Sequence, residues 1–166
     1  AHPGEEQGAT EQYQRNTQSH SIIQDVITSP LSQQNDQLQS WKGKVDLLQF
    51  QQISQGINKQ NAAIGHDSFA YFQSNPAVTQ AAIRNSEVSN GLGEALTDPA
   101  QIERYATTNP VDANLMAQRN HGIPEDNLRA MSKPESTALV TEVNQSSPTD
   151  KVSILNEFMN QYKTPQ

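Results

Sequence analysis

The chain has 166 residues, of which 33% are hydrophobic and 5% are aromatic, and its formal net charge at pH 7 is −7. Globular chains are typically about 45–50% apolar on a count that includes Gly, so we expect one domain of ordinary size with a modest core. The acidic charge disfavours nucleic-acid binding, the absence of Cys excludes disulfides and Cys-ligated metals, and no apolar run approaches the roughly 18 residues of a membrane span.

The first 18 residues show no helical period, and Tyr13 is their only large apolar residue. Such a composition cannot bury enough surface to offset the entropy lost on ordering. We therefore predict a disordered arm over residues 1–18 and a single helical domain over residues 19–166. The chain starts with Ala instead of Met, which we expect of a processed chain or of an excised piece.

A short helix is predicted after the arm. It follows a cap-like Ser19 or Ser21, and Pro30 interrupts it. Its apolar face consists of Ile22, Ile23, Val26 and Ile27.

The most regular pattern of the chain predicts a long amphipathic helix over about residues 32–60. Apolar residues at steps of seven, three, four and three form an a/d seam. The seam consists of Leu31, Leu38, Trp41, Val45 and Leu48. Further apolar residues widen the face, as a helix packed inside a bundle requires, and we favour this interpretation over an intermolecular coiled coil. Gly43 weakens the predicted helix by about 1 kcal/mol relative to Ala.

After Gly65, prolines follow short polar residues again and again. They are Pro76, Pro99, Pro110, Pro124, Pro134 and Pro148. Pro is well tolerated in the first turn of a helix, and Asn75, Asp98 and Asn109 are good N-caps. Each Pro is therefore predicted to begin a helix, which gives about five to seven short helices.

The last two of these helices carry clear apolar residues. One is predicted over residues 135–147 with Leu139, Val140 and Val143. The other starts at about Thr149, and its face predicts tight docking. That face consists of Val152, Ile154, Leu155, Phe158, Met159 and Tyr162.

The predicted fold class is all-α, because no long segment alternates apolar and polar residues. It comprises one long amphipathic helix and a compact bundle of short Pro-started helices, preceded by the disordered arm. Pro110 and Pro134 lie 24 positions apart, as do Pro124 and Pro148. The flanking apolar residues do not keep this register, so we favour short helices of similar length over a helix-pair repeat.

Few polar residues of the sequence are arranged as a catalytic or metal site would require. None of the four His lies four positions from another, so we predict no metal and no cofactor. His66, Asp67 and Ser68 are the residue types of a hydrolytic triad, but adjacent residues cannot adopt its geometry, so Asp67 or Ser68 is predicted to cap a helix. His121 is predicted to end a helix and complement its dipole, with Gly122 as the left-handed cap.

A glycan-cleaving or other hydrolase is the alternative function. Such an enzyme needs a Glu in an apolar pocket that raises its pKa. Glu94 lies beside Leu92 and Leu96, and Glu103 or Glu142 could pair with it by residue type alone. The low aromatic content argues against a sugar cleft.

We expect instead a non-catalytic helical module that acts in protein–protein interaction or as a structural part. The Gln-rich amphipathic helix and the lack of a reactive constellation favour it. A protein partner or a second copy is expected to bind through residues 31–57. The candidate residues are Leu38, Trp41, Val45, Leu48 and Ile53. The setting stays open between a secretion-apparatus part, an effector and a virion component, and export is favoured over the cytoplasm.

Overall fold

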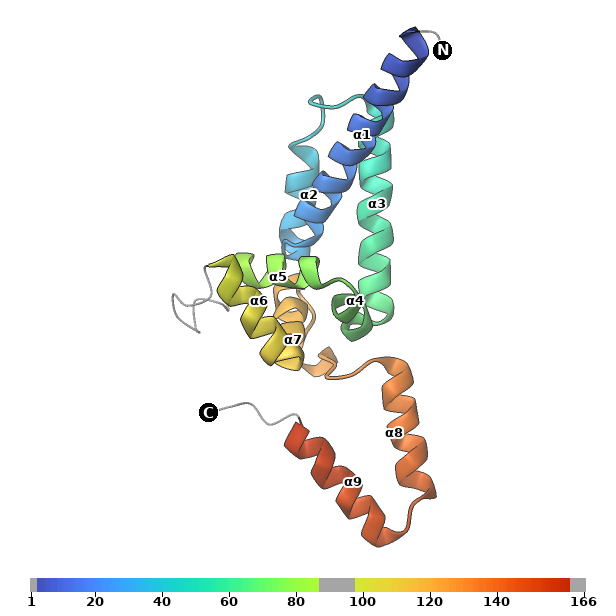
Figure 1. Cartoon of the computed structure of the whole chain (residues 1–166), viewed down its shortest axis with the longest axis vertical. Helices are drawn as coiled ribbons and strands as arrows, with labels where there is room; N and C mark the ends of the chain where they lie inside the picture. Colours follow the sequence, from blue (N-terminus) through green and yellow to red (C-terminus); the bar gives the residue numbers. More distant parts are fainter. Residues whose placement is uncertain (1–2, 87–97, 162–166) are drawn as a thin grey trace.

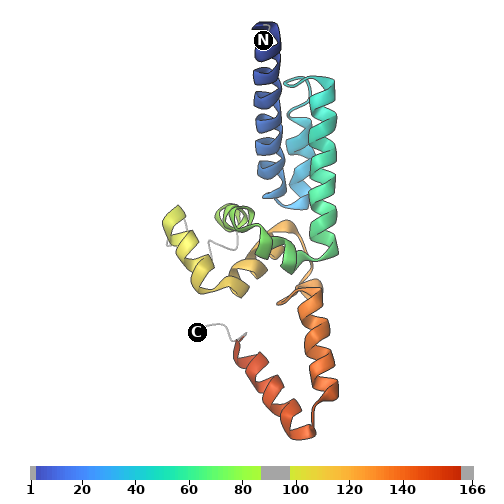
Figure 2. The same ribbon diagram turned by 45° about the vertical axis from the view of Figure 1, so that its right-hand side comes forward.

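A computed structural model of the chain describes residues 3–86 and 98–161, with side chains for residues 8–86 and 98–160. These residues form nine α-helices and no strand, which confirms the predicted all-α class. The helices fall into three groups that follow one another along the chain (Figures 1 and 2).

The first group is a three-helix unit. Its helices are α1 (Pro3–Ile27), α2 (Leu31–Gln39) and α3 (Leu47–His66). α1 and α3 run in the same direction and α2 runs in the opposite one (Figures 1 and 2). The two longer helices approach closely at Gly56 of α3, where an added Cβ would collide with Ile23 of α1.

Helix α1 changes the account of the predicted arm. From Pro3 onward the described part of residues 1–18 is helical, and no Pro or Gly interrupts α1 after Gly8. Every described side chain from Gly8 to Gln18 is nevertheless exposed, so this half of α1 stays outside the core, as its composition predicts. Its first turns project beyond the start of α3 (Figure 1).

The predicted helix over residues 32–60 is two helices in the structure, α2 and α3, joined by residues 40–46. Gly43 lies in the connection with a φ of +86°, a left-handed conformation that Gly adopts without steric cost. The carboxylate of Asp46 then caps α3 by accepting a 2.8 Å hydrogen bond from Gln49 N. An a/d pattern can continue across such a turn, because apolar residues on both sides of it can face the same core.

The second group consists of short helices at the end of the first group where α1 and α3 end (Figure 1). Its members are α4 (Ser68–Ser74), α5 (Pro76–Asn85), α6 (Pro99–Thr108) and α7 (Pro110–His121). Each predicted Pro start except one lies in the first two positions of an α-helix. Pro124 is the exception, since only a 3₁₀ turn, Glu125–Asn127, follows it.

The predicted side-chain caps are correct at Asp98 and Asp67 and wrong at Asn75 and Asn109. Asp98 accepts a hydrogen bond from Ala100 N at 3.0 Å, and Asp67 accepts one from Ala70 N at 3.1 Å. Asn75 and Asn109 do stand at the N-cap positions of α5 and α7, but neither side chain makes such a bond. Asn75 Nδ2 instead donates to the carbonyl of Tyr71.

Two hydrophobic clusters form the core of these two groups. The larger joins α1 and α3 to α4, α5 and α7, and the smaller joins α5, α6 and α7. Fully buried members of the larger cluster include Val26, Ile53, Ile64 and Phe72. Ile83, Ile102, Ala113 and Met116 make up the smaller one.

The third group is a hairpin of α8 (Lys133–Gln145) and α9 (Pro148–Gln161), which diverge from their connecting turn and extend away from the other helices (Figures 1 and 2). The prediction that the last helix docks tightly is wrong for its described residues, because none of them is buried. Tyr162 lies outside the described residues. Amphipathic periodicity correctly predicts the helix, but it does not say which surface covers its apolar side.

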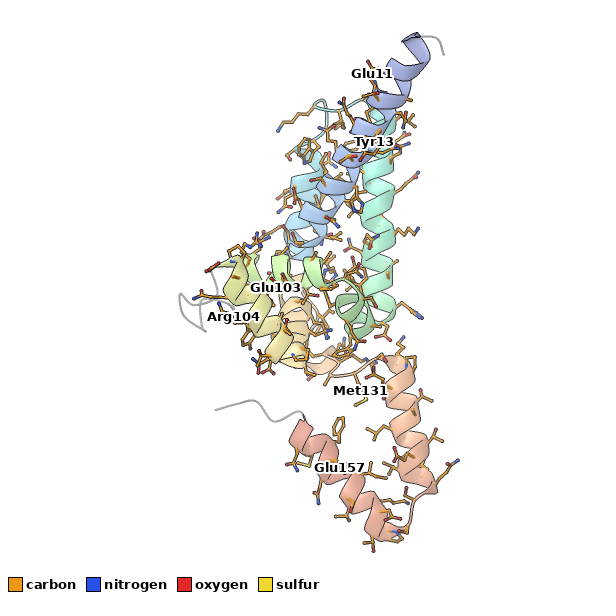
Figure 3. All side chains as sticks on the ribbon, in the orientation of Figure 1. Glu11, Tyr13, Glu103, Arg104, Met131 and Glu157 are labelled. Atoms are coloured by element: carbon orange, nitrogen blue, oxygen red, sulfur yellow. The ribbon has the colours of Figure 1, made fainter. Side chains whose placement is uncertain are left out.

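The start of this hairpin is held by two polar side chains, buried Gln118 and half-buried Asp67. Gln118 of α7 accepts a 3.0 Å hydrogen bond from Arg129 N and donates one of 2.8 Å to Arg129 O. Asp67 caps α4 with one carboxylate oxygen and accepts a 2.8 Å bond from Lys133 N with the other. Met131 lies at this junction (Figure 3). The hairpin is therefore presented from a fixed base.

Candidate protein-interaction surface

The five predicted partner-binding residues differ in how deeply the structure buries them. Ile53 is 0% exposed and belongs to the larger core cluster, so it is unavailable to a partner. Leu38, Trp41 and Val45 are half-buried and pack against the same cluster. Leu48 is 65% exposed. Residues 31–57 thus supply both core and surface, and the surface part gathers around Trp41 and the start of α3.

The turn around Trp41 is well ordered by its own contacts. Lys44 N donates a 3.0 Å hydrogen bond to Trp41 O, and the backbones of Lys42 and Val45 form an isolated β-bridge. The Lys44 ammonium lies 5.6 Å from the centre of the Trp41 ring, within the range of a cation–π contact. These contacts orient the Trp41 indole within its turn.

Polar contacts tie this end of α3 to α1. Gln49 Nε2 donates a 2.9 Å hydrogen bond to Gln18 Oε1. Arg15 forms an ion pair with Asp46 at 3.6 Å, and both side chains are about half exposed, so this pair adds little stability. Together these contacts set the position of α1 relative to the Trp41 turn.

An open groove runs along α1 beside Trp41, with a volume of about 410 Å³. We call it the Trp41 groove, and its lining residues are Tyr13, Gln14, Thr17, Gln18, Ser21, Ile22, Asp25 and Trp41. Aromatic and aliphatic carbon forms part of the wall, while amides and hydroxyls offer hydrogen bonds. Asp25 is the one charged residue of this lining. Such a groove can accept an apolar side chain or a helix edge with polar neighbours.

The same end of the three-helix unit exposes further apolar side chains. Tyr13 and Leu47 are each 72% exposed, and Leu48 follows at 65%. Tyr13 projects from the first half of α1 (Figure 3). These residues and the Trp41 groove form the largest concentration of accessible apolar groups on the described part of the first two helix groups.

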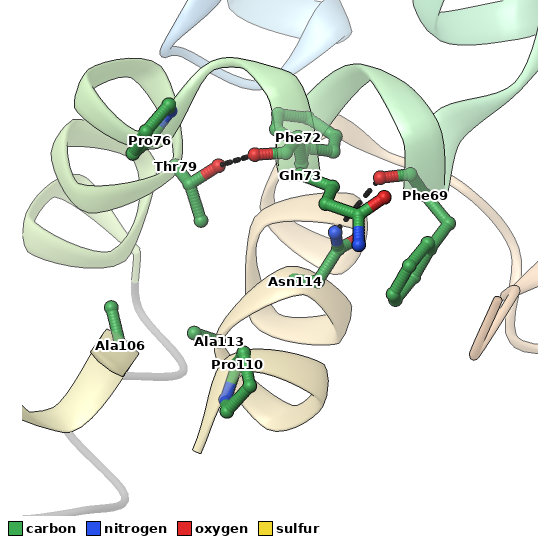
Figure 4. Close-up of a pocket in the computed structure, with 9 residues that line it drawn as sticks. All are labelled: Phe69, Phe72, Gln73, Pro76, Thr79, Ala106, Pro110, Ala113 and Asn114. Carbon is green, nitrogen blue, oxygen red and sulfur yellow. Dashed lines mark hydrogen bonds between the residues drawn. The ribbon is translucent and has the colours of Figure 1, made fainter. Parts of the chain in front are cut away.

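A second cavity lies where α4, α5, α6 and α7 meet (Figure 4). Its volume is about 130 Å³, and its lining is mainly apolar, with Phe69, Phe72 and Ala113 among its walls. Asn114 and Thr79 also line it, but their polar atoms already bond to the carbonyls of Phe69 and Phe72. The cavity is smaller than the roughly 300 Å³ of typical ligand sites and contains no titratable side chain.

His121 is the described histidine with the most perturbed surroundings. It is 4% exposed, its Nδ1 has no hydrogen-bond partner, and its ring meets Phe72 edge-on at 6.5 Å. Burial lowers the pKa of His121 from its usual 6.5 to about 4. His121 is therefore neutral at pH 7, so it does not place a cation at the end of α7 as predicted. The predicted cap at Gly122 is confirmed by its φ of +111°.

Among the described residues, the carboxylates considered for a hydrolase do not come together in a buried site. Glu94 lies outside them, and Glu103 and Glu142 are exposed on α6 and α8 (Figure 3 for Glu103). No described Asp or Glu is buried, and no described group of three His, Asp or Glu could hold a metal. His66 is exposed and Asp67 is occupied as a cap.

No family model matches the chain, and no curated protein or solved structure shows significant similarity to it. None of the described helices is long and apolar enough to cross a membrane. Function is therefore inferred from the geometry of this chain.

Sequence reasoning missed Tyr13 and the α1 side of the groove. The residues that line it at helical spacing, such as Thr17 and Ser21, are small and polar, so no apolar period marks them. The available signal was the absence of Pro and Gly between residues 9 and 27, which allows a continuous helix through the predicted arm.

Proposed function

We propose that this chain is a non-catalytic helical interaction module whose protein partner binds at the Trp41 groove. The observation that carries the proposal is the groove itself: an open, partly aromatic trough of about 410 Å³ whose lining includes Tyr13 and Trp41. Well-ordered aromatic side chains in open grooves are typical anchors of protein interfaces.

The lining indicates the chemistry of the partner. An amphipathic helix or a short segment with an apolar anchor would pack on Trp41 and Ile22, with polar groups that reach the amides of Gln14 and Gln18. A basic residue at the far end would meet Asp25. The absence of Cys makes such binding independent of redox conditions, which is compatible with an exported setting such as a secretion apparatus, an effector or a virion.

The proposal is tested by filling the groove without touching the core. Thr17 is exposed and lines the groove, so Thr17→Arg places a long side chain in it. Gln55→Arg is the matched control, because Gln55 is exposed about 160° around α3 from buried Ile53, away from α1. Full-length chains are used to capture partners from the native host, and bound proteins are quantified by mass spectrometry.

We expect a protein that binds the unmodified chain and the Gln55→Arg variant but is lost from the Thr17→Arg variant, with helicity unchanged by circular dichroism. Equal capture by both variants would show that the groove is not the binding site. Capture of no protein by the unmodified chain would argue against an interaction module.

A further inference from the structure

Helix α2 (Leu31–Gln39) is the shortest helix of the three-helix unit, and polar residues dominate it. Only two of its nine residues, Leu31 and Leu38, are apolar, and Leu31 is 47% exposed. The one residue of α2 that is buried is itself polar, Gln34 at 5% exposure. A helix of nine residues is not stable by itself in water. Contacts with the rest of the chain must therefore hold α2 in place, and few of these contacts are apolar.

Two side-chain amides connect α2 to α3. Asn61 Nδ2 of α3 donates a 2.7 Å hydrogen bond to Gln34 Oε1, and Gln34 Nε2 donates one of 3.0 Å to the carbonyl of Ser29. The other end of the Asn61 amide, Oδ1, is buried without a hydrogen-bond partner in the described part of the chain. A buried acceptor that is left unpaired costs free energy, and water can pair it when the contact opens. The contact that holds α2 on α3 is therefore incompletely satisfied.

The contact between α1 and α3 is of a different kind. Gly56 of α3 lies so close to Ile23 of α1 that an added Cβ would collide with it. Ile53 and Ile57 of α3 and Val26 of α1 are buried members of the larger hydrophobic cluster. These two helices consequently form a frame whose packing does not depend on the amides of α2.

The chain is anchored on both sides of α2. Before it, the carbonyl of Thr28 accepts the buried hydrogen bond of Asn120 from α7. After it, Asp46 caps the start of α3. Between α2 and Asp46 lies Gly43, with a φ of +86° and no atom within 4 Å of a would-be Cβ, so the turn has room to pivot there. Residues 29–45 thus form a segment between two fixed points, which we call the α2 strap.

The α2 strap supplies one wall of the Trp41 groove. Seven of the eight lining residues belong to α1, and Trp41 alone comes from the strap. Trp41 N donates a 3.0 Å hydrogen bond to the carbonyl of Leu38, so the indole directly follows the last turn of α2. Leu38, Trp41 and Val45 are only half-buried where they pack against the larger cluster. A movement of α2 therefore moves Trp41 relative to α1 and changes the width of the groove.

We propose that the α2 strap releases from α3 while the rest of the chain stays folded, and that this release opens the Trp41 groove. Segments with few buried apolar contacts open locally at a lower free energy than the core, and the strap is such a segment beside the frame of α1 and α3. Its use in admitting a partner rests on the proposed function, whereas the release is a property of the chain alone.

Amide hydrogen exchange of the full chain measures the release. We expect the amides of residues 35–39 to exchange at least about tenfold faster than those of residues 53–57, after correction for their intrinsic rates. Gln34→Ala removes both amide contacts and should speed exchange in residues 35–39 at least about tenfold further, with residues 53–57 unchanged. Gln33→Ala is the matched control, because Gln33 is exposed on the same helix.

Two results of this exchange experiment would overturn the release. One is equal exchange in the two segments of the unmodified chain, which means that α2 opens only when the whole chain unfolds. The other is a Gln34→Ala variant in which both segments speed up alike or residues 35–39 do not respond.

A second experiment tests whether the release opens the groove, and it uses the absence of Cys from the sequence. Ile22 lines the groove and is 3% exposed, so the thiol of Ile22→Cys should react with a maleimide only when the groove opens. Adding Gln34→Ala should raise this labelling rate at least about fivefold, and adding Gln33→Ala should not. Ile83→Cys is the control thiol, because Ile83 is buried in the smaller cluster away from the strap, and its rate should stay constant.

Unchanged labelling of Ile22→Cys by Gln34→Ala would contradict the opening of the groove, as would an equal rise at Ile83→Cys. Both experiments use the chain without a partner. Their outcome is therefore independent of the capture experiment with Thr17→Arg, so the failure of the strap and the failure of the proposed function can be told apart.

Discussion

Asn120 of α7 donates a hydrogen bond from Nδ2 to the carbonyl oxygen of Thr28, at 2.8 Å and across 92 positions of the chain. Both residues are buried, and Thr28 directly follows Ile27, the last residue of α1. This bond joins the three-helix unit that forms the Trp41 groove to the group of short helices. The two groups are thus coupled by a buried polar contact in addition to the larger hydrophobic cluster.

Removal of this bond should weaken the whole fold. In Asn120→Ala the Thr28 carbonyl loses a buried donor, and we expect a loss of about 1–3 kcal/mol in the free energy of unfolding. Urea denaturation followed by circular dichroism measures it. Asn58→Ala is the control, because Asn58 is exposed on α3. Equal midpoints for the two variants would show that the bond is not formed in solution.

The close approach of α1 and α3 should tolerate no large side chain at Gly56. Gly56→Leu would push Ile23 out of the contact, and overpacking of this kind costs about 1–3 kcal/mol. Gly65 lies on the same helix with no atom within 4 Å of a would-be Cβ, so Gly65→Leu should be neutral or stabilising through helix propensity. Thermal denaturation of the Gly56→Leu and Gly65→Leu variants measures the difference. A melting temperature that falls equally in both would contradict the close packing of Gly56 against Ile23.

Two residues of the predicted binding set should behave in opposite ways. Ile53→Ala creates a cavity in the core and should cost about 2–5 kcal/mol of stability. Leu48→Ala changes an exposed side chain and should stay within about 0.5 kcal/mol of the unmodified chain. Chemical denaturation with urea measures both. A strong loss of stability in Leu48→Ala with none in Ile53→Ala would contradict the assignment of Ile53 to the core and Leu48 to the surface.

That contrast shows what the periodicity could and could not predict. The step pattern from Leu31 to Leu48 predicts one amphipathic helix, but Trp41 and Val45 lie in the connection between α2 and α3. The pattern also combines core, groove and exposed positions in one seam. Burial depends on the turn at Gly43 and on the position of α1, and both are tertiary features. A face of a helix identifies which residues lie together, not what covers them.

Sequence predictions were more often correct where a single residue determines the local backbone conformation. The prolines mark helix starts because their φ and missing N–H act within a single turn. Gly122 ends α7 for a similarly local reason. Asn75 and Asn109 make no side-chain cap bond, and each is at once the C-cap of one helix and the N-cap of the next. Likewise, the apolar residues of α9 predict its helix but not its exposed position.

Acid should destabilise the fold through His121. Its pKa is about 4 in the folded chain and about 6.5 when unfolded, so the unfolded state takes up the proton first as pH falls. The contribution to stability is fully present above pH 6.5 and is lost as pH falls toward 4, up to about 3 kcal/mol. His121→Met should flatten this part of the pH profile of unfolding. His66→Gln serves as the control at an exposed position, and an equally flattened profile there would contradict the assignment.

The most direct test of the central claim, that a protein partner occupies the Trp41 groove, is site-specific photo-crosslinking in the native host. A photoreactive residue is placed at Thr17, inside the groove, or at Gln55, on the outward side of α3. We predict one specific crosslinked protein at position 17 whose yield falls sharply at position 55. Identical products at both positions, or products at position 55 alone, would contradict the claim.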